Sequence, residues 1–399
     1  MIPTLVICGG RVFTMNGAPI EQGYVCIQNG KIAGIGSMEE QELIAEWKKA
    51  KVPFLEVPDS IIMPGIIEAH CHMGITEEKK GMEGDDCNEN VDPITPMLRA
   101  IDAINTMDAA FDDAVRAGIT SAMIGPGSSN VVGGQFAFIK TKGRCIDELI
   151  VLAPAAMKVA FGENPKVNFS GQSKSPVTRM AIAAMLREEL FKAKQYQSRN
   201  ESEKKDFHYE AWLPVLERKI PIKAHVHRAD DILTAIRIAK EYNLQMTLDH
   251  CSEGHLIAEE VAKSGFPAIV GPDLASRSKI EVQNMAFKTV GILNQAGVKT
   301  AITTDHPVSL IQSLPICAGL AVKAGMDWEE ALKSITIYAA QICGVADRVG
   351  SLEKGKDADI AIFSGNPLEV QTRTLYTMID GKVVYAEDVS SLPGRTKKV

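Results

Sequence analysis

The sequence lacks the features that mark several large classes of protein. None of its apolar stretches approaches the roughly 18 residues that a membrane span needs. The beginning, "MIPTLVICGGRVF", has no basic residue before its apolar run and no small-residue cleavage site, which argues against a secretory signal. The eight cysteines form no CxxC pair and no disulfide framework, as is typical of reduced thiols. We therefore expect a cytoplasmic protein without a membrane partner.

The chain also has no excess of basic residues over acidic ones. The chain has 43 lysines and arginines against 50 acidic residues, and the basic residues are scattered, which argues against nucleic acid as a partner. A hydrophobic content of 45% is ordinary for a soluble globular protein. A length of 399 residues suits one large domain together with a smaller one.

The two ends of the chain resemble each other and differ from the middle. Short β-rich runs stand near the beginning ("TLVICGGRVFTM", "GYVCIQNGKIAGIG") and near the end ("DADIAIFSG", "TMIDGKVVYAED"), with Asn-Gly and Asp-Gly turns. Neither end has enough strands for a core of its own. We predict that residues 1–60 and 351–399 together form one small β-sandwich.

The middle of the chain, residues 61–350, alternates between apolar strands and amphipathic helices. The alternation is clearest in "IKAHVH", "DDILTAIRIAKEY", "LQMTLDH", "GHLIAEEVAKSG" and "PAIVGP". Continuously apolar strands that are each followed by a helix indicate a parallel sheet covered by helices. The segment has room for eight such units, so the predicted fold class is α/β, with a (β/α)8 TIM barrel. A doubly wound open sheet is the alternative.

Histidine is rare, with eight residues in the chain, and most of these stand where a predicted strand ends. The polar residues at four strand ends are His70 and His72, His225 and His227, His250, and Asp305 with His306. In a barrel the carboxyl ends of the strands converge on one face, where active sites are built. We expect these side chains to lie close together.

Such a cluster favours a divalent metal ion. Because alternate residues of a strand share a face, His70 and His72 can bind one ion together. Imidazole and carboxylate are natural ligands for zinc and similar ions. A metal lowers the pKa of water, and Asp305 can carry the proton to a leaving group. A single histidine is more often a hydrogen-bonded core or surface residue, but the set as a whole favours a metal.

In these motifs the sequence resembles the amidohydrolase superfamily, and within it the imidazolonepropionase-related metal-dependent hydrolases. "MPGIIEAHCHMG" resembles the first-strand HxH motif, and "KAHVH", "LDHC" and "ITTDHP" resemble the motifs of the fifth, sixth and eighth strands. "GSLEKGKDADIAIF" and "IDGKVVY" resemble the return to the small β domain. The resemblance covers nearly the whole chain, and it implies a barrel, a flanking β-sandwich and metal-dependent hydrolysis of C–N bonds.

The resemblance also implies a set of metal ligands. His70, His72 and Asp305 would hold a first metal, and His225 and His250 a second. In binuclear members a carboxylated lysine bridges the metals, and Lys158 in "LAPAAMKVAFGENP" is the candidate, although a strand-end lysine that reaches solvent is the alternative. We expect two zinc ions per chain, with Asp305 as the catalytic residue.

Three functions remain open at this stage. The first is hydrolysis of a cyclic amide or a peptide-like bond in a small molecule by a metal-activated hydroxide, with Asp305 as proton shuttle. The second is deamination of a heterocycle at one metal, but the glutamate that such deaminases usually carry is replaced by Arg228. The third is a non-enzymatic relative with the same fold. The resemblance is also compatible with a homo-oligomer. The candidates for substrate binding are His227, Arg228, Arg277 and His306.

Overall fold

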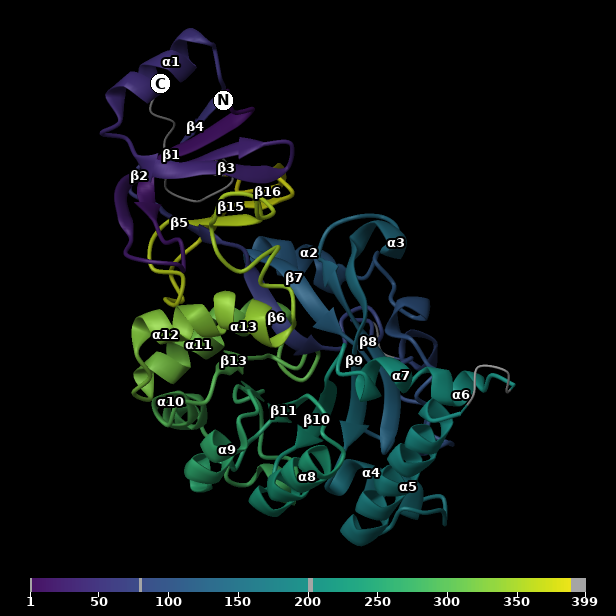
Figure 1. Cartoon of the computed structure of the whole chain (residues 1–399). Helices are drawn as coiled ribbons and strands as arrows, with labels where there is room; N and C mark the ends of the chain where they lie inside the picture. Colours follow the sequence, from purple (N-terminus) through teal and green to yellow (C-terminus); the bar gives the residue numbers. More distant parts are fainter. Residues whose placement is uncertain (1, 79–80, 200–203, 389–399) are drawn as a thin grey trace.

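The protein is described by a computed structural model that covers residues 2–78, 81–199 and 204–388. A sheet built from both ends of the chain stands above a barrel with helices around it (Figure 1). Within the described residues, no helix combines the length and the hydrophobicity that a membrane span requires.

The terminal sheet contains strands from both ends of the chain. Its strands are β1 (Leu5–Val12), β2 (Ile20–Gln28), β3 (Lys31–Ser37), β4 (Phe54–Glu56), β5 (Ile61–Pro64), β14 (Ile360–Phe363), β15 (Thr374–Ile379) and β16 (Lys382–Ala386). The antiparallel pair β5 and β14, with Ile62 opposite Ile362, joins the two ends. Helix α1 (Gln41–Lys49) buries Trp47 against one face of the sheet. The prediction that the two ends combine is confirmed, and their strands form one continuous hydrogen-bonded sheet.

The second sheet forms the barrel. Its strands are β6 (Ile66–Cys71), β7 (Ile119–Ile124), β8 (Val132–Lys140), β9 (Ile150–Ala160), β10 (Ile222–Val226), β11 (Met246–His250), β12 (Ala268–Val270) and β13 (Thr300–Ile302). They follow one another in chain order around the sheet, and β13 returns to contact β6. Sequential order with a return to the first strand is the arrangement of a barrel, so the predicted barrel is confirmed and the doubly wound alternative is excluded.

One strand departs from the parallel pattern. Strand β8 runs antiparallel to both β7 and β9. Only residues 125–131 connect β7 to β8, whereas a parallel crossover needs a dozen or more residues. The glycine-rich connection therefore forms a hairpin where a regular (β/α)8 barrel would place a helix.

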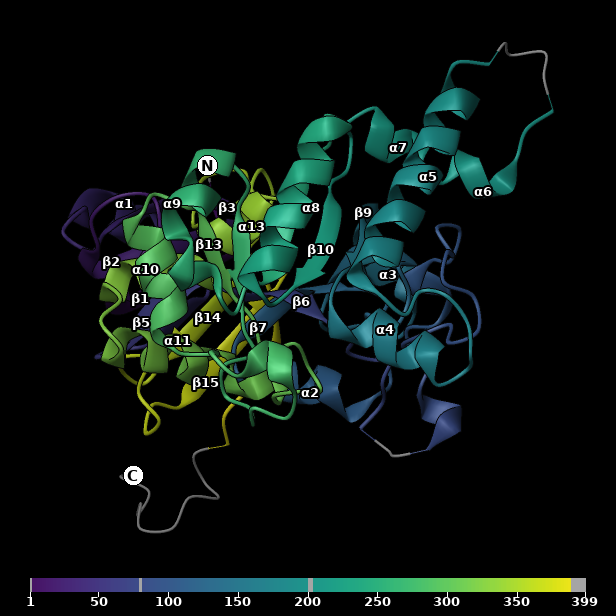
Figure 2. The same cartoon turned by 90° about the horizontal axis from the view of Figure 1, so that it is seen from below.

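Helices surround the barrel (Figures 1 and 2). The helices are α2 (Ala109–Arg116), α3 (Ile146–Leu149), α4 (Glu163–Ser170), α5 (Arg179–Gln197), α6 (Phe207–Glu210), α7 (Leu213–Leu216), α8 (Ala229–Glu241), α9 (Ala258–Ser264), α10 (Lys288–Gln295), α11 (Leu314–Lys323), α12 (Trp328–Ser334) and α13 (Ile337–Ile342). Helix α8 shows how they attach, because Ile232, Ile236 and Ala239 recur at helical spacing and are buried.

A buried carboxylate closes the seam between the first and last barrel strands. Glu68 on β6 is fully buried and accepts hydrogen bonds from the Thr303 hydroxyl at 2.5 Å and from the Thr304 N–H at 2.9 Å. Burial raises the pKa of Glu68 to about 7. This contact fixes the carboxyl end of β6 against the segment that follows β13.

A buried ionic cluster joins the barrel to the terminal sheet. Lys140, at the end of β8, donates hydrogen bonds to Asp357 at 2.9 Å and to Asp359 at 2.6 Å.

In Lys140→Met the Asp359 carboxylate stays buried without its cation, and we expect a loss of roughly 3 kcal/mol in the free energy of unfolding. Urea titration checks this, with Lys142→Met as the matched control, because Lys142 makes an exposed ion pair. Equal unfolding midpoints in the two variants would contradict the role of the cluster.

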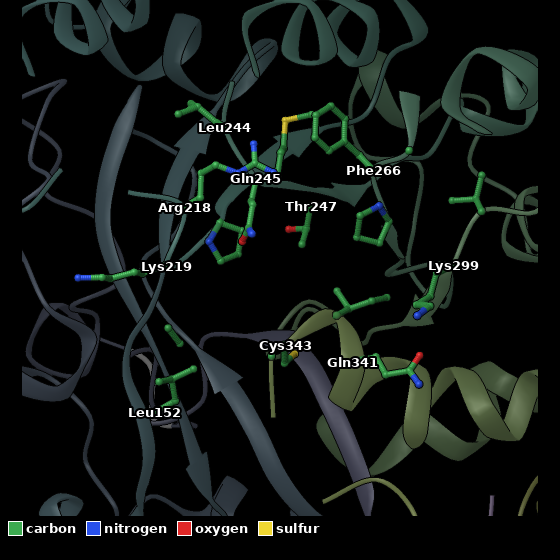
Figure 3. Close-up of a pocket in the computed structure, with 18 of the residues that line it drawn as sticks. Leu152, Arg218, Lys219, Leu244, Gln245, Thr247, Phe266, Lys299, Gln341 and Cys343 are labelled. Carbon is green, nitrogen blue, oxygen red and sulfur yellow. The ribbon is translucent and has the colours of Figure 1, made fainter. Parts of the chain in front are cut away.

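The amino ends of the barrel strands enclose a cavity of about 550 Å³ (Figure 3). Gln245 and Thr247, at the beginning of β11, line it together with Phe266 and Lys299. Strand β11 ends at His250, so this cavity and the histidine cluster lie at opposite ends of the same strand.

Candidate metal centre

The carboxyl ends of the barrel strands bring the predicted ligands into one buried cluster. His70 lies on β6, Lys158 on β9 and His225 on β10, while β11 ends at His250. None of the predicted ligands is more than 9% exposed: His70, His72, Lys158, His225, His250 and Asp305. Charged and polar groups buried to this degree require partners, and here they are one another's neighbours.

Asp305 faces the two histidines of the first strand. Its Oδ1 lies 3.2 Å from His72 Nε2 and 3.6 Å from His70 Nε2. No donor among the described residues hydrogen-bonds this buried oxygen. His70, His250 and Asp305 also offer ligand atoms that all lie within 4.8 Å of one another. A divalent cation fits this set, because nitrogen lone pairs and a carboxylate oxygen converge where the protein supplies no hydrogen-bond donor for that oxygen.

Two further rings, those of His225 and His227, form a second group together with His250. The ring centroids of His225 and His250 are 4.5 Å apart, and those of His225 and His227 are 4.6 Å apart. One ligand atom from each of these three histidines lies within 4.8 Å of the other two. Because His250 belongs to both groups, the two groups are contiguous.

Three of the histidine rings are held through Nδ1, whereas Nδ1 of His225 has no hydrogen-bond partner among the described residues. Nδ1 of His72 donates to the Gly125 carbonyl at 2.7 Å, and Nδ1 of His250 donates to the Gly271 carbonyl at 2.8 Å. Nδ1 of His70 is 2.7 Å from the buried carboxylate of Asp249. A carbonyl oxygen only accepts, so the proton sits on Nδ1 and the Nε2 lone pair is available to a metal.

Lys158 is fully buried, so it does not reach solvent. Its Nζ lies 3.3 Å from His70 Nε2. Burial lowers the pKa of Lys158 to about 8, which increases the fraction of neutral amine at physiological pH.

The pKa values of the cluster reflect burial and mutual repulsion. Burial, followed by neighbouring positive charge, lowers the pKa values of His70 and His225 well below the ordinary range. Burial acts in the same direction on His72, but Cys87 and Asp305 outweigh it and raise the pKa of His72 to about 10.

The backbone is strained at two of these positions. His250 has φ 72° and Asp305 has φ 51°, values that residues other than glycine rarely adopt. Such strain persists where the surrounding structure imposes it and is typical of functional sites.

The predicted substrate-binding residues lie in different surroundings. His227 is in the second group, whereas the buried His306 has Nδ1 3.2 Å from the Ile311 N–H, which donates to it. The guanidinium of Arg228 is paired with Asp230 at 2.9 Å on the surface. Nη2 of Arg277 donates to the Met285 carbonyl at 3.0 Å. Their roles toward a substrate remain predictions.

Sequence reasoning missed three residues that touch the cluster. Asp249 orients His70. In the sequence it is marked only by its position directly before His250 in strand β11. Cys87 is a buried thiol beside His72. Glu281 lies 3.8 Å from both His225 Nε2 and His227 Nε2. Cys87 and Glu281 come from loops with no recognisable motif.

Comparison with known proteins agrees with this geometry. The model of the amidohydrolase family matches residues 61–384. The chain belongs to the amidohydrolase family. It is a member of a family of metal-dependent hydrolases, and its buried His and Asp groups indicate a site for a divalent metal.

Individual family members resemble the chain to different extents. An amidohydrolase of Thermotoga maritima of known structure is 36% identical with a TM-score of 0.91, covering 96% of this chain and 100% of that chain. An amidohydrolase of Hapsidospora irregularis is 28% identical over 85% of this chain, which spans 39% of that relative's length. An imidazolonepropionase of Brucella anthropi is 23% identical, and the match covers 86% of this chain and 87% of that relative.

Proposed function

We propose that this amidohydrolase hydrolyses a C–N amide bond in a small molecule, either a cyclic amide or a peptide-like bond. The observation that carries the proposal is the pair of contiguous ligand groups that share His250. Two adjacent positions of this kind fit a binuclear centre, and imidazole with carboxylate suits zinc. A metal bound there supplies activation of water and polarisation of the amide carbonyl.

The side chains of this protein bind the metals and transfer the proton. His70, His72 and Asp305 hold the first position, and His225 and His250 contribute to the second. Asp305 accepts the proton of the attacking water and transfers it to the leaving nitrogen. Burial raises the pKa of Asp305, but His250 and His72 together bring it below the ordinary value, so the side chain is an ionised carboxylate, as a metal ligand must be.

Lys158, as a carbamate, is the proposed bridge between the two positions. The neutral amine adds to CO2 and loses a proton, which replaces an ammonium that would repel the metals with an anionic bidentate group. Support comes from its complete burial and from the 3.3 Å between Nζ and His70 Nε2.

Replacement of Lys158 by alanine tests the bridge. Lys158→Ala should hold at most one metal tightly, and activity should fall with the second metal. Elemental analysis measures the metals, and wild-type protein in ¹³C-bicarbonate should show a carbamate carbon resonance that the variant lacks. Short-chain carboxylic acids, which fit the space left by the side chain, should restore part of the second occupancy. Two tightly held metals in untreated Lys158→Ala would exclude the bridge.

A further inference from the structure

Asp249 is a fully buried carboxylate in the barrel interior, and both of its oxygens have partners. It lies on β11, directly before His250. Its Oδ1 accepts a hydrogen bond from the Thr247 hydroxyl at 2.6 Å, and its Oδ2 lies 2.7 Å from His70 Nδ1 and 3.1 Å from Lys223 Nζ. These contacts fix the carboxylate against the nitrogen of His70 that a metal at Nε2 leaves free.

The partner of His70 differs in charge from the partners of His72 and His250. Those two rings donate from Nδ1 to neutral backbone carbonyls, whereas His70 faces the carboxylate of Asp249. A carboxylate at Nδ1 makes Nε2 a more basic ligand, because it stabilises the positive charge that the ring gains when Nε2 binds a cation. Of these three rings, only that of His70 therefore has a partner that strengthens its donation to a metal in this way.

Lys223 opposes the effect of this carboxylate. It lies on β10, the strand next to β11, and is 1% exposed. Its Nζ also donates to the Ala69 carbonyl at 3.3 Å, so the ammonium is held between Asp249 and the strand that carries His70. A positive charge 3.1 Å from Oδ2 reduces the negative potential that Asp249 exerts on the His70 ring, and salt screens such a buried pair only weakly.

Stability of the barrel does not account for this buried ion pair. Two charges withdrawn from water cost free energy that their attraction only offsets, and well-packed apolar residues of similar volume are often as stable. We propose that Lys223 is a positioning residue of the first metal position: by neutralising Asp249 it weakens the donation of His70, so that a bound metal is held less tightly and polarises an amide carbonyl more strongly. This inference rests on the proposed function and concerns the position held by His70, His72 and Asp305.

The test is a double-mutant cycle on zinc and cobalt binding to the full-length chain. The apoprotein is titrated against a chromophoric chelator, and the visible spectrum of bound Co²⁺ reports the ligand field independently of activity. The equivalent that reports on the first position is the one that His72→Ala loses. Asp249→Asn should weaken this equivalent about 10–100-fold, because the charged acceptor is gone and the ammonium of Lys223 is left unpaired.

Removal of the lysine should act in the opposite direction in both backgrounds. Lys223→Met should tighten the same equivalent on the order of tenfold and shift the cobalt bands, because the full charge of Asp249 then acts on His70. The double variant Lys223→Met/Asp249→Asn should bind more tightly than Asp249→Asn alone, because the unpaired ammonium no longer repels the metal. It contains neither charge of the pair, so this second comparison keeps the test decisive if Lys223→Met does not fold.

Lys140→Met is the matched control, because Lys140 is a buried lysine paired with Asp357 and Asp359 and not with a metal ligand. Both equivalents should bind to it as tightly as to the wild type, which separates the effect of charge near His70 from a general loss of stability. Weaker or unchanged binding on removal of Lys223 would overturn the proposal, since the pair would then serve only the structure of the barrel. A wild-type chain that binds no metal would instead contradict the proposed function.

Discussion

Replacing Asp305 with asparagine should reduce hydrolysis on the order of 10³-fold or more while the protein stays folded. Asparagine keeps the size of the side chain and tolerates the left-handed backbone that this position adopts, with φ 51°. It cannot accept the proton of the attacking water, and it removes the charge that faces His70 and His72 at 3.6 and 3.2 Å.

The measurement is kcat/KM for Asp305→Asn on an amide substrate identified with the wild-type chain, together with the thermal unfolding midpoint. A large loss of rate with a midpoint within a few degrees of wild type agrees with a catalytic role. Near-normal turnover would remove Asp305 as the proton carrier, whatever the metal content.

The second large effect concerns His72. In His72→Ala the first metal position loses the nitrogen that lies 3.2 Å from Asp305 Oδ1. Loss of a residue that only orients a ligand costs about 10–100-fold in metal affinity, so loss of a ligand should cost more than about 100-fold. We expect at least one equivalent of metal to disappear, and hydrolysis with it.

His208→Ala is the matched control for His72→Ala. His208 lies on α6, pairs with Glu189 and belongs to neither of the two ligand groups. Both metal equivalents should remain in this variant. Full metal content in His72→Ala itself would contradict the first metal position.

The gathering of the strand-end histidines and Asp305 could be predicted because it follows from regular structure. Alternation along a strand places His70 and His72 on one face, and a barrel brings the carboxyl ends of its strands together. The family resemblance pointed to Lys158 late in an apolar strand, and β9 contains this residue, while its role as a bridge stays a prediction.

Other features depend on contacts between segments far apart in the sequence. Glu281 reaches the cluster from an irregular loop, whose path is set by its bond to the Glu163 N–H across the barrel mouth. Glu68 meets Thr303 only when the barrel closes. The antiparallel direction of β8 comes from a short connection that the helix-strand alternation elsewhere in the chain does not reveal.

The central claim is that the histidines at the strand ends hold metal, and metal content tests it most directly. The protein is purified without chelator, with bicarbonate present, and analysed for zinc, manganese and iron. The account predicts about two equivalents per chain. One equivalent would instead favour deamination of a heterocycle at a single metal, and none, even after metal is added back, would contradict the account.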